Sequence, residues 1–207
     1  MENRLRKALL TAVDRYYTPG LPSRENWDLE LDRLVAEKVN ETSDSVRQWS
    51  ALVDKLRSSL SIQVHNHSFL QFPNLSLLVE SKEVVNDVTI LRNFQVFLSL
   101  LCPFYTYYYE YQHRVKVSGG KTLFVGSHAF FSTPEFRELK LPFSEAGVSD
   151  LLSAFFPDYS YCNHYELMLF EIDGVVPYRA DPAFPETDRH SMFQVLFNNE
   201  QPENFHP

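Results

Sequence analysis

The sequence predicts an α+β fold in which N-terminal helices, a central antiparallel β-meander of 4–5 strands and C-terminal helices form one core. Three changes of pattern carry this prediction. Apolar residues recur at helical spacing up to about residue 60, a period near two with many β-branched and aromatic residues follows to residue 131, and helix signals then return. We expect a single domain over 1–207, made of a helical layer (1–60), an antiparallel sheet (61–131) and an acidic helix and loop region (132–207).

The helical layer contains two or three predicted helices. Apolar side chains between Leu5 and Tyr16 share one helix face, and a Thr-Pro-Gly sequence at 18–20 ends that helix. A second helix is expected from residue 23, and a third begins at Ser43 or Asp44. Since no Gly or Pro interrupts the chain from the second helix onward, the second and third could also form one bent helix.

Five strands are predicted in the sheet region, because β-branched and aromatic residues dominate there. Their expected bounds are 62–67, 75–81, 88–101, 105–117 and 122–131. Gly119 and Gly120 separate the last two strands. A Gly-Gly pair favours a two-residue hairpin turn, because glycine adopts positive φ without steric cost.

The fourth of these strands carries five tyrosines between residues 105 and 111. Because side chains alternate between the faces of a strand, four of the tyrosines share a face with His113, and the other face is mostly polar. This alternation predicts a strand buried on one side. The two-residue turn would also place His128 opposite Tyr111, so that both histidines lie on the tyrosine-bearing face.

Two interpretations of that face stay open. In one, the N-terminal helices cover it and the tyrosines are core residues whose hydroxyl groups bond at the rim. In the other, the face is an exposed binding surface. The candidate contact residues of this second interpretation are Tyr107, Tyr109, Tyr111, His113 and His128.

Helices are predicted again after the sheet. A Thr-Pro-Glu sequence at 133–135 has the residue order of a helix N-terminus, and an apolar helix around Val148 and Leu152 ends at Pro157. The segment 163–172 is apolar on more than one face, so that helix and strand both fit. A last helix is expected over 187–198, with Asp188 in its first turn.

The charge of the chain is concentrated in its last third. Net charge is −8, and residues 132–207 hold four basic and thirteen acidic side chains. This excess disfavours nucleic acid as a partner and favours a basic protein. The carboxylates expected to steer and bind that protein are Asp173, Asp181, Glu186 and Asp188. A solvated acidic surface that serves solubility is the alternative.

The sequence assigns no catalytic residue, no cofactor and no metal. It contains no phosphate-binding loop, nucleophile elbow or zinc-protease motif, which makes an enzyme the less favoured class. His65 and His67 have the spacing of two metal ligands, but no third ligand has a matching spacing. Cys162, His164 and Glu166 are neighbours in sequence, whereas the members of a catalytic triad converge from different elements.

Together these patterns favour a non-enzymatic protein-binding module of a bacterial type, such as an immunity or inhibitor protein that occludes a basic partner. We expect it in the cytoplasm, because no secretory leader and no membrane span are recognisable. One alternative is a small-ligand binder or enzyme with a pocket at the 105–131 hairpin that uses His113 and His128. A second alternative is a subunit of a homo-oligomer whose interface is the tyrosine-bearing face.

Overall fold

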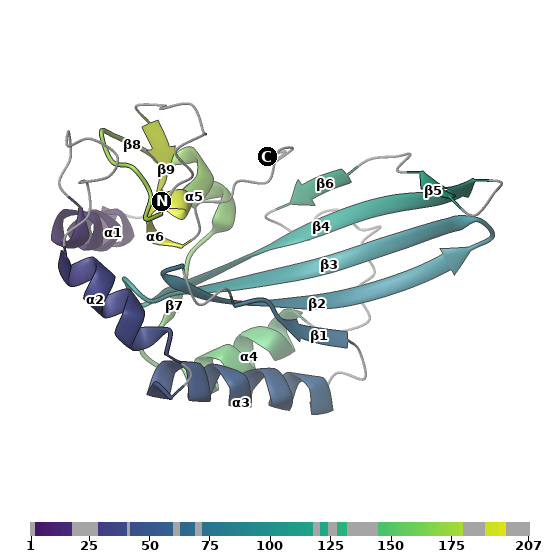
Figure 1. The fold of residues 1–207 in the computed structure, drawn as a ribbon, viewed down its shortest axis with the longest axis horizontal. Coiled ribbons are helices and arrows are strands. Elements are labelled where there is room, and N and C mark those ends of the chain that lie inside the picture. Colours follow the sequence, from purple (N-terminus) through teal and green to yellow (C-terminus); the bar gives the residue numbers. More distant parts are fainter. Residues whose placement is uncertain are drawn as a thin grey trace.

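The computed structural model describes residues 3–17, 29–40, 42–59, 63–68, 72–117, 121–123, 128–131, 145–179 and 189–197. The fold is α+β, as predicted, with helices at both ends of the chain and a mostly antiparallel meander between them (Figure 1). The helices are α1 (Asn3–Tyr16), α2 (Leu29–Lys38), α3 (Asp44–Ser59), α4 (Glu145–Phe155), α5 (His164–Leu169) and α6 (Met192–Leu196). The strands are β1 (Gln63–Asn66), β2 (Asn74–Val85), β3 (Val88–Ser99), β4 (Phe104–Val117), β5 (Lys121–Leu123), β6 (His128–Phe131), β7 (Ser160–Tyr161), β8 (Glu171–Asp173) and β9 (Arg189–Ser191).

Seven of these strands form one sheet. β1 to β4 follow each other as antiparallel neighbours, so the predicted meander is confirmed. The other edge of β4 receives three short strands, of which β5 and β6 are antiparallel and β7 is parallel. β8 and β9 pair separately as a small two-stranded sheet.

The two faces of the main sheet have different partners. We call the face with Tyr105, Tyr107, Tyr109, Tyr111 and His113 the tyrosine face, and the opposite one the concave face. α3 and α4 lie along the tyrosine face (Figure 1). Trp49 of α3 is fully buried in this layer. Its ring lies 6.0 Å from the ring of Phe156, and its Nε1 donates a hydrogen bond of 3.3 Å to Asn66 Oδ1 of β1.

At one end of the sheet, α5 and α6 cover the concave face as well. The Tyr108 ring of β4 lies 4.8 Å from the His164 ring of α5, and Phe97 of β3 meets Phe193 of α6 edge-on at 5.2 Å. With helices on both sides, the first half of β4 is buried on both faces. The predicted burial on one side only is therefore wrong for this half of the strand.

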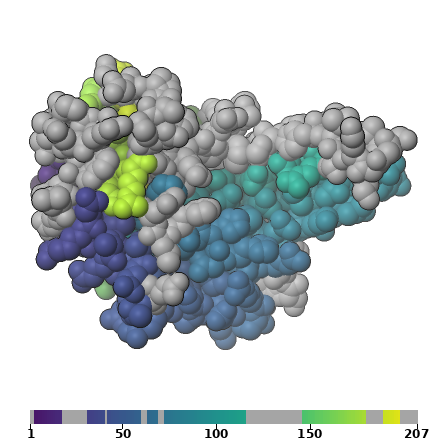
Figure 2. Space-filling view, in the orientation of Figure 1, coloured from purple at the N-terminus to yellow at the C-terminus, as the bar shows by residue number. Residues whose placement is uncertain are grey.

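The opposite end of the sheet projects beyond the helices as an arm, which the space-filling view shows in teal (Figures 1 and 2). The arm ends in the β2–β3 hairpin, whose turn is formed by Asn86 and Asp87. Asn86 has a φ of 55°, a conformation that asparagine tolerates better than most residues. This turn extends β2 to Val85, four residues beyond the predicted end of the strand.

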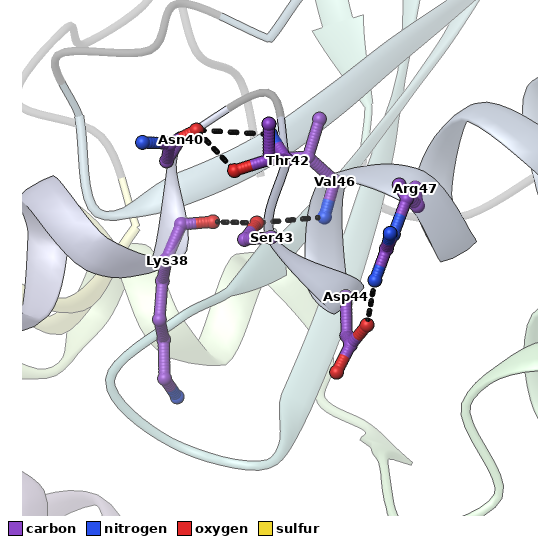
Figure 3. A network of polar contacts seen from close by, with 7 residues as sticks. All are labelled: Lys38, Asn40, Thr42, Ser43, Asp44, Val46 and Arg47. Carbon is purple, nitrogen blue, oxygen red and sulfur yellow. Dashed lines mark hydrogen bonds and ion pairs between the residues drawn. The ribbon is translucent and has the colours of Figure 1, made fainter.

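A polar network separates α2 from α3 at the corner between them (Figure 3). Ser43 caps α3, because its Oγ accepts the Val46 N–H at 3.2 Å and donates to the Lys38 carbonyl at 2.7 Å. Asn40 Oδ1 accepts hydrogen bonds from the backbone N–H and the hydroxyl of Thr42, at 2.9 and 2.8 Å. The second and third predicted helices are thus two helices and not one bent helix.

The strand predicted over 122–131 is two short strands with a different register. Val117 pairs with Lys121 in β5, one residue away from the prediction. In β6, His128 pairs with Gln112 and not with Tyr111, so the predicted placement of both histidines at one face is wrong. The prediction assumed one constant register from the turn onward. The register of β6 against β4 differs from that of β5, so the predicted pairs do not form. The two glycines of the predicted turn lie outside the described residues.

The C-terminal helices are shorter than predicted. α4 ends before Pro157, as expected, and the ambiguous segment 163–172 contains both α5 and the start of β8. α6 begins only at Met192, because residues 189–191 form β9, so the first part of the predicted helix over 187–198 is wrong. The predicted helix start at 133–135 and Asp188 lie outside the described residues. No helix in the described part of the chain combines the length and the apolar character needed to cross a bilayer.

Candidate binding site on the concave face of the sheet

The tyrosine face is mostly core. Tyr109 is fully buried and Tyr107 is 7% exposed, and both rings contact Phe94 of β3, at 5.1 and 4.9 Å between centroids. The packing interpretation of this face therefore holds for these tyrosines, which offer no surface to a partner.

Tyr111 and His113 lie farther along β4, where the tyrosine face is half-buried. Their side chains contact each other: the Tyr111 hydroxyl is 2.6 Å from His113 Nε2, and the rings meet edge-on at 4.6 Å. The Tyr111 hydroxyl and His113 Nε2 are therefore hydrogen-bonded to each other. The register places His128 opposite Gln112, on the other face of the sheet from Tyr111 and His113.

The predicted acidic contact residues are brought together only in part. Asp173 is exposed in β8. Its Oδ1 forms an ion pair with Arg189 Nε of β9 at 2.8 Å. Glu171 lies 3.9 Å from the same guanidinium. A basic partner would have to compete with Arg189 for both carboxylates. Asp181, Glu186 and Asp188 lie outside the described residues.

The arm carries a cavity of about 680 Å³ on the concave face. β2, β3 and β4 build its floor from side chains that stand next to each other across the strands. These cross-strand rows are Glu80–Asn93–Glu110, Lys82–Leu91–Gln112 and Val84–Thr89–Arg114, with His67, Leu78 and Gln95 at the end nearer the helices. We call the first row the acidic rung.

Hydrogen bonds fix part of this floor. Asn93 Nδ2 donates to Glu110 Oε2 at 2.8 Å, and Arg114 Nε donates to Gln112 Oε1 at 2.7 Å. Asn93 and Gln112 are each 7% exposed, so these two side chains are largely buried within the surface of the sheet. A rigid three-stranded platform with polar groups in fixed positions is suited to recognition by hydrogen bonds.

His67 adds a titratable group to one end of the cavity. Its pKa is lowered, first by partial burial and second by the neighbouring His65, while the carboxylates of Glu80 and Glu110 act in the opposite direction. The lowered pKa makes the neutral imidazole the dominant form at neutral pH. His67 can therefore both donate and accept a hydrogen bond there.

The sequence neighbours Cys162 and His164 are core residues. Burial, followed by Cys102 and Glu166, raises the pKa of the Cys162 thiol to about 12, which is opposite to the change that activates a nucleophilic cysteine. Burial lowers the pKa of His164 to about 3. These values argue against the cysteine–histidine arrangement that the sequence raised.

The two histidines of β1 and its following turn lie near each other, with 6.0 Å between the ring centroids of His65 and His67. Within the described ranges, no three His, Cys, Asp or Glu side chains are grouped so that they could hold a metal ion. The pair thus gains no third ligand from the residues that the structure places.

The concave face was missed by the sequence analysis, although part of its signal was present. The polar residues Glu110, Gln112 and Arg114 alternate with the tyrosine face along β4. Matching polar residues in β2 and β3 complete the site only through the register of the three strands. The chain matches no protein-family model, no curated protein and no solved structure.

Proposed function

We propose that the protein is a non-enzymatic binding module for a basic protein, and that the concave face of the arm is its contact surface. A bacterial immunity or inhibitor protein that acts in the cytoplasm is the concrete form of this proposal. The class of protein is the one that the sequence favours. The proposed contact surface is the concave face of the sheet, in place of the tyrosine face and the C-terminal carboxylates.

The observation that carries the proposal is the cavity itself. The described helices do not cover this half of the concave face, and the lining of the cavity contains three acidic and two basic side chains together with fixed amides. Polar groups held rigidly around a hollow favour the insertion of a protruding segment of a partner. Steric occlusion follows if that segment belongs to the functional site of the partner.

Charge supports a basic partner. The chain carries a net charge of −8, which would speed the approach of a basic protein at low salt. At the cavity, Glu80 and Glu110 occupy the centre of the floor, whereas Arg114 and Lys82 lie toward the tip of the arm. The two glutamates therefore lie nearer the helices than the two basic side chains do.

The test compares capture by the immobilised protein with capture by a charge-reversed variant. Glu80→Lys/Glu110→Lys should lose at least about tenfold of the captured partner, since like charges facing a basic segment cost several kcal/mol. Asp150→Lys/Asp158→Lys is the matched control, because it makes the same change of net charge at two exposed carboxylates, one in α4 and one just after it. The captured protein should be basic and should elute as salt is raised.

Three outcomes would overturn the proposal: an acidic partner, binding that is insensitive to salt, or equal loss in the variant and the control. Circular dichroism and thermal unfolding of each variant show whether the substitutions leave the fold intact. A loss of capture counts only for variants that unfold at the temperature of the parent protein.

The size of the cavity favours a small polar ligand as a second candidate. A volume of about 680 Å³ falls within the range of small-molecule sites. Such a ligand would bind on the concave face, because neither His113 nor any other residue of the tyrosine face lines the cavity. A thermal shift with a polar metabolite that Gln95→Trp abolishes would support this candidate.

A further inference from the structure

The acidic rung contains a buried acceptor without a donor. Asn93 uses its Nδ2 to donate to Glu110, which directs its Oδ1 away from that carboxylate. Oδ1 is closed to solvent and has no hydrogen-bond partner among the groups that the structure places. An unsatisfied buried acceptor costs about 1–3 kcal/mol, and a donor from outside the chain would remove this cost.

The neighbour of Asn93 on the other side is also an acceptor. Glu80 stands directly across from Asn93 in the register of β2 and β3. Its carboxylate forms no ion pair or hydrogen bond with the described residues, although it influences the pKa of His67. The acidic rung thus presents the carboxylate of Glu80, the amide oxygen of Asn93 and the carboxylate of Glu110 in a row across three strands.

We propose that the acidic rung receives the guanidinium group of an arginine side chain on the basic partner. This inference rests on the proposed function and names the chemical group that the concave face recognises. A guanidinium presents five N–H donors in one plane, so it can donate to a carboxylate and to an adjacent amide oxygen at the same time. A lysine ammonium is a compact point charge that satisfies such a row less completely.

The burial of Asn93 sets a condition for this contact. Since Oδ1 is closed to solvent, an incoming donor reaches it only after a rim side chain has moved aside. Lys82 and His67 line the same cavity, and both residues are exposed.

The test is a titration of the full ¹⁵N-labelled protein with N-acetyl-arginine amide, followed through the Asn93 side-chain NH₂ signals. These signals should shift saturably, with a dissociation constant in the millimolar range that suits a single residue. N-acetyl-citrulline amide has the same shape without the charge and should shift them at least tenfold less. N-acetyl-lysine amide should bind more weakly than the arginine probe.

Variants connect the shift to the rung. Glu80→Gln should weaken binding about tenfold, and Asp150→Asn, which changes an exposed carboxylate of α4, should leave it unchanged. Glu80 is the better single variant because Glu110 also holds Asn93, and the ¹⁵N spectrum itself shows whether each variant is folded. Equal shifts with citrulline, or undiminished binding by Glu80→Gln, would overturn the proposal. If the titration fails but the protein still captures a basic protein in a salt-dependent way, the proposed function stands and only the arginine contact is refuted.

Discussion

The buried imidazole of His164 should make the fold sensitive to mild acid. The ring is completely buried between Tyr108 and Phe193, at 4.8 and 4.5 Å, and burial lowers its pKa to about 3. In the unfolded chain a histidine titrates near pH 6.5. Below pH 6.5 the unfolded chain binds a proton at this histidine and the folded protein does not. The free energy of unfolding is therefore highest above pH 6.5 and falls as the pH is lowered toward 3.

The size of the effect follows from the two pKa values. Each pH unit between 6.5 and 3 removes about 1.4 kcal/mol from the free energy of unfolding. Between pH 7.5 and pH 5.0 the loss that His164 contributes is therefore about 2 kcal/mol. For a urea dependence near 2 kcal/mol per M, the midpoint should fall by about 1 M through this residue alone.

The assay is urea unfolding at a series of pH values for the parent protein and His164→Phe. The variant keeps an aromatic ring between Tyr108 and Phe193 but has no titrating group, so its stability should fall less between pH 7.5 and 5.0. His67 and His190, whose pKa values are also lowered by burial, contribute equally to both proteins and cancel in the comparison. Parallel pH profiles of the parent and His164→Phe would refute the reasoning. Phe156→Leu, a core change without titration, should lower stability equally at every pH.

Three further changes test the packing and the capping. Trp49→Ala should cost about 3–5 kcal/mol in urea unfolding, because it empties a fully buried site between α3 and β1; a cost below 1 kcal/mol would contradict the described core. Tyr178→Phe should cost about 1–2 kcal/mol, since its hydroxyl donates to Asp32 Oδ1 at 2.6 Å, and Asp32→Asn should reduce that difference in a double-mutant cycle. Ser43→Ala should cost about 1 kcal/mol through loss of the α3 cap, and Ser43→Asp should restore most of it, as circular dichroism melting can show.

Local patterns in the sequence predicted the main elements of the fold. Helical spacing predicted α1 and α3, and alternation along β4 predicted a strand over nearly its full length. These signals are local, because the side-chain periodicity of a helix or strand is visible within one continuous segment of the sequence. The Asn-Asp turn that lengthens β2 is also a local signal, since its two residues are adjacent in the sequence.

The candidate site was not predictable in the same way. Its acidic rung joins residues 13 and 17 positions apart in sequence through two strand registers, and a shift of one residue would move every side chain to the other face. Which part of the concave face stays open depends on where α5 and α6 end, and those short helices were predicted poorly. Alternation along β4 also could not reveal that Tyr108 is buried, since a polar-looking face can be covered by a distant segment.

The unequal edges of the main sheet bear on self-association. β4 is protected by β5, β6 and β7, whereas β1 pairs only with Leu77–Glu80 of β2, so that residues 81–85 of β2 have no partner on that side among the described residues. An unpaired strand edge is a template on which another chain can add a strand. Lys82 and Glu83 put charges on this stretch, next to the exposed Val84 and Val85. Removal of these two charges would turn the tip of the arm into a starting point for edge-to-edge aggregation, at a site remote from the buried core.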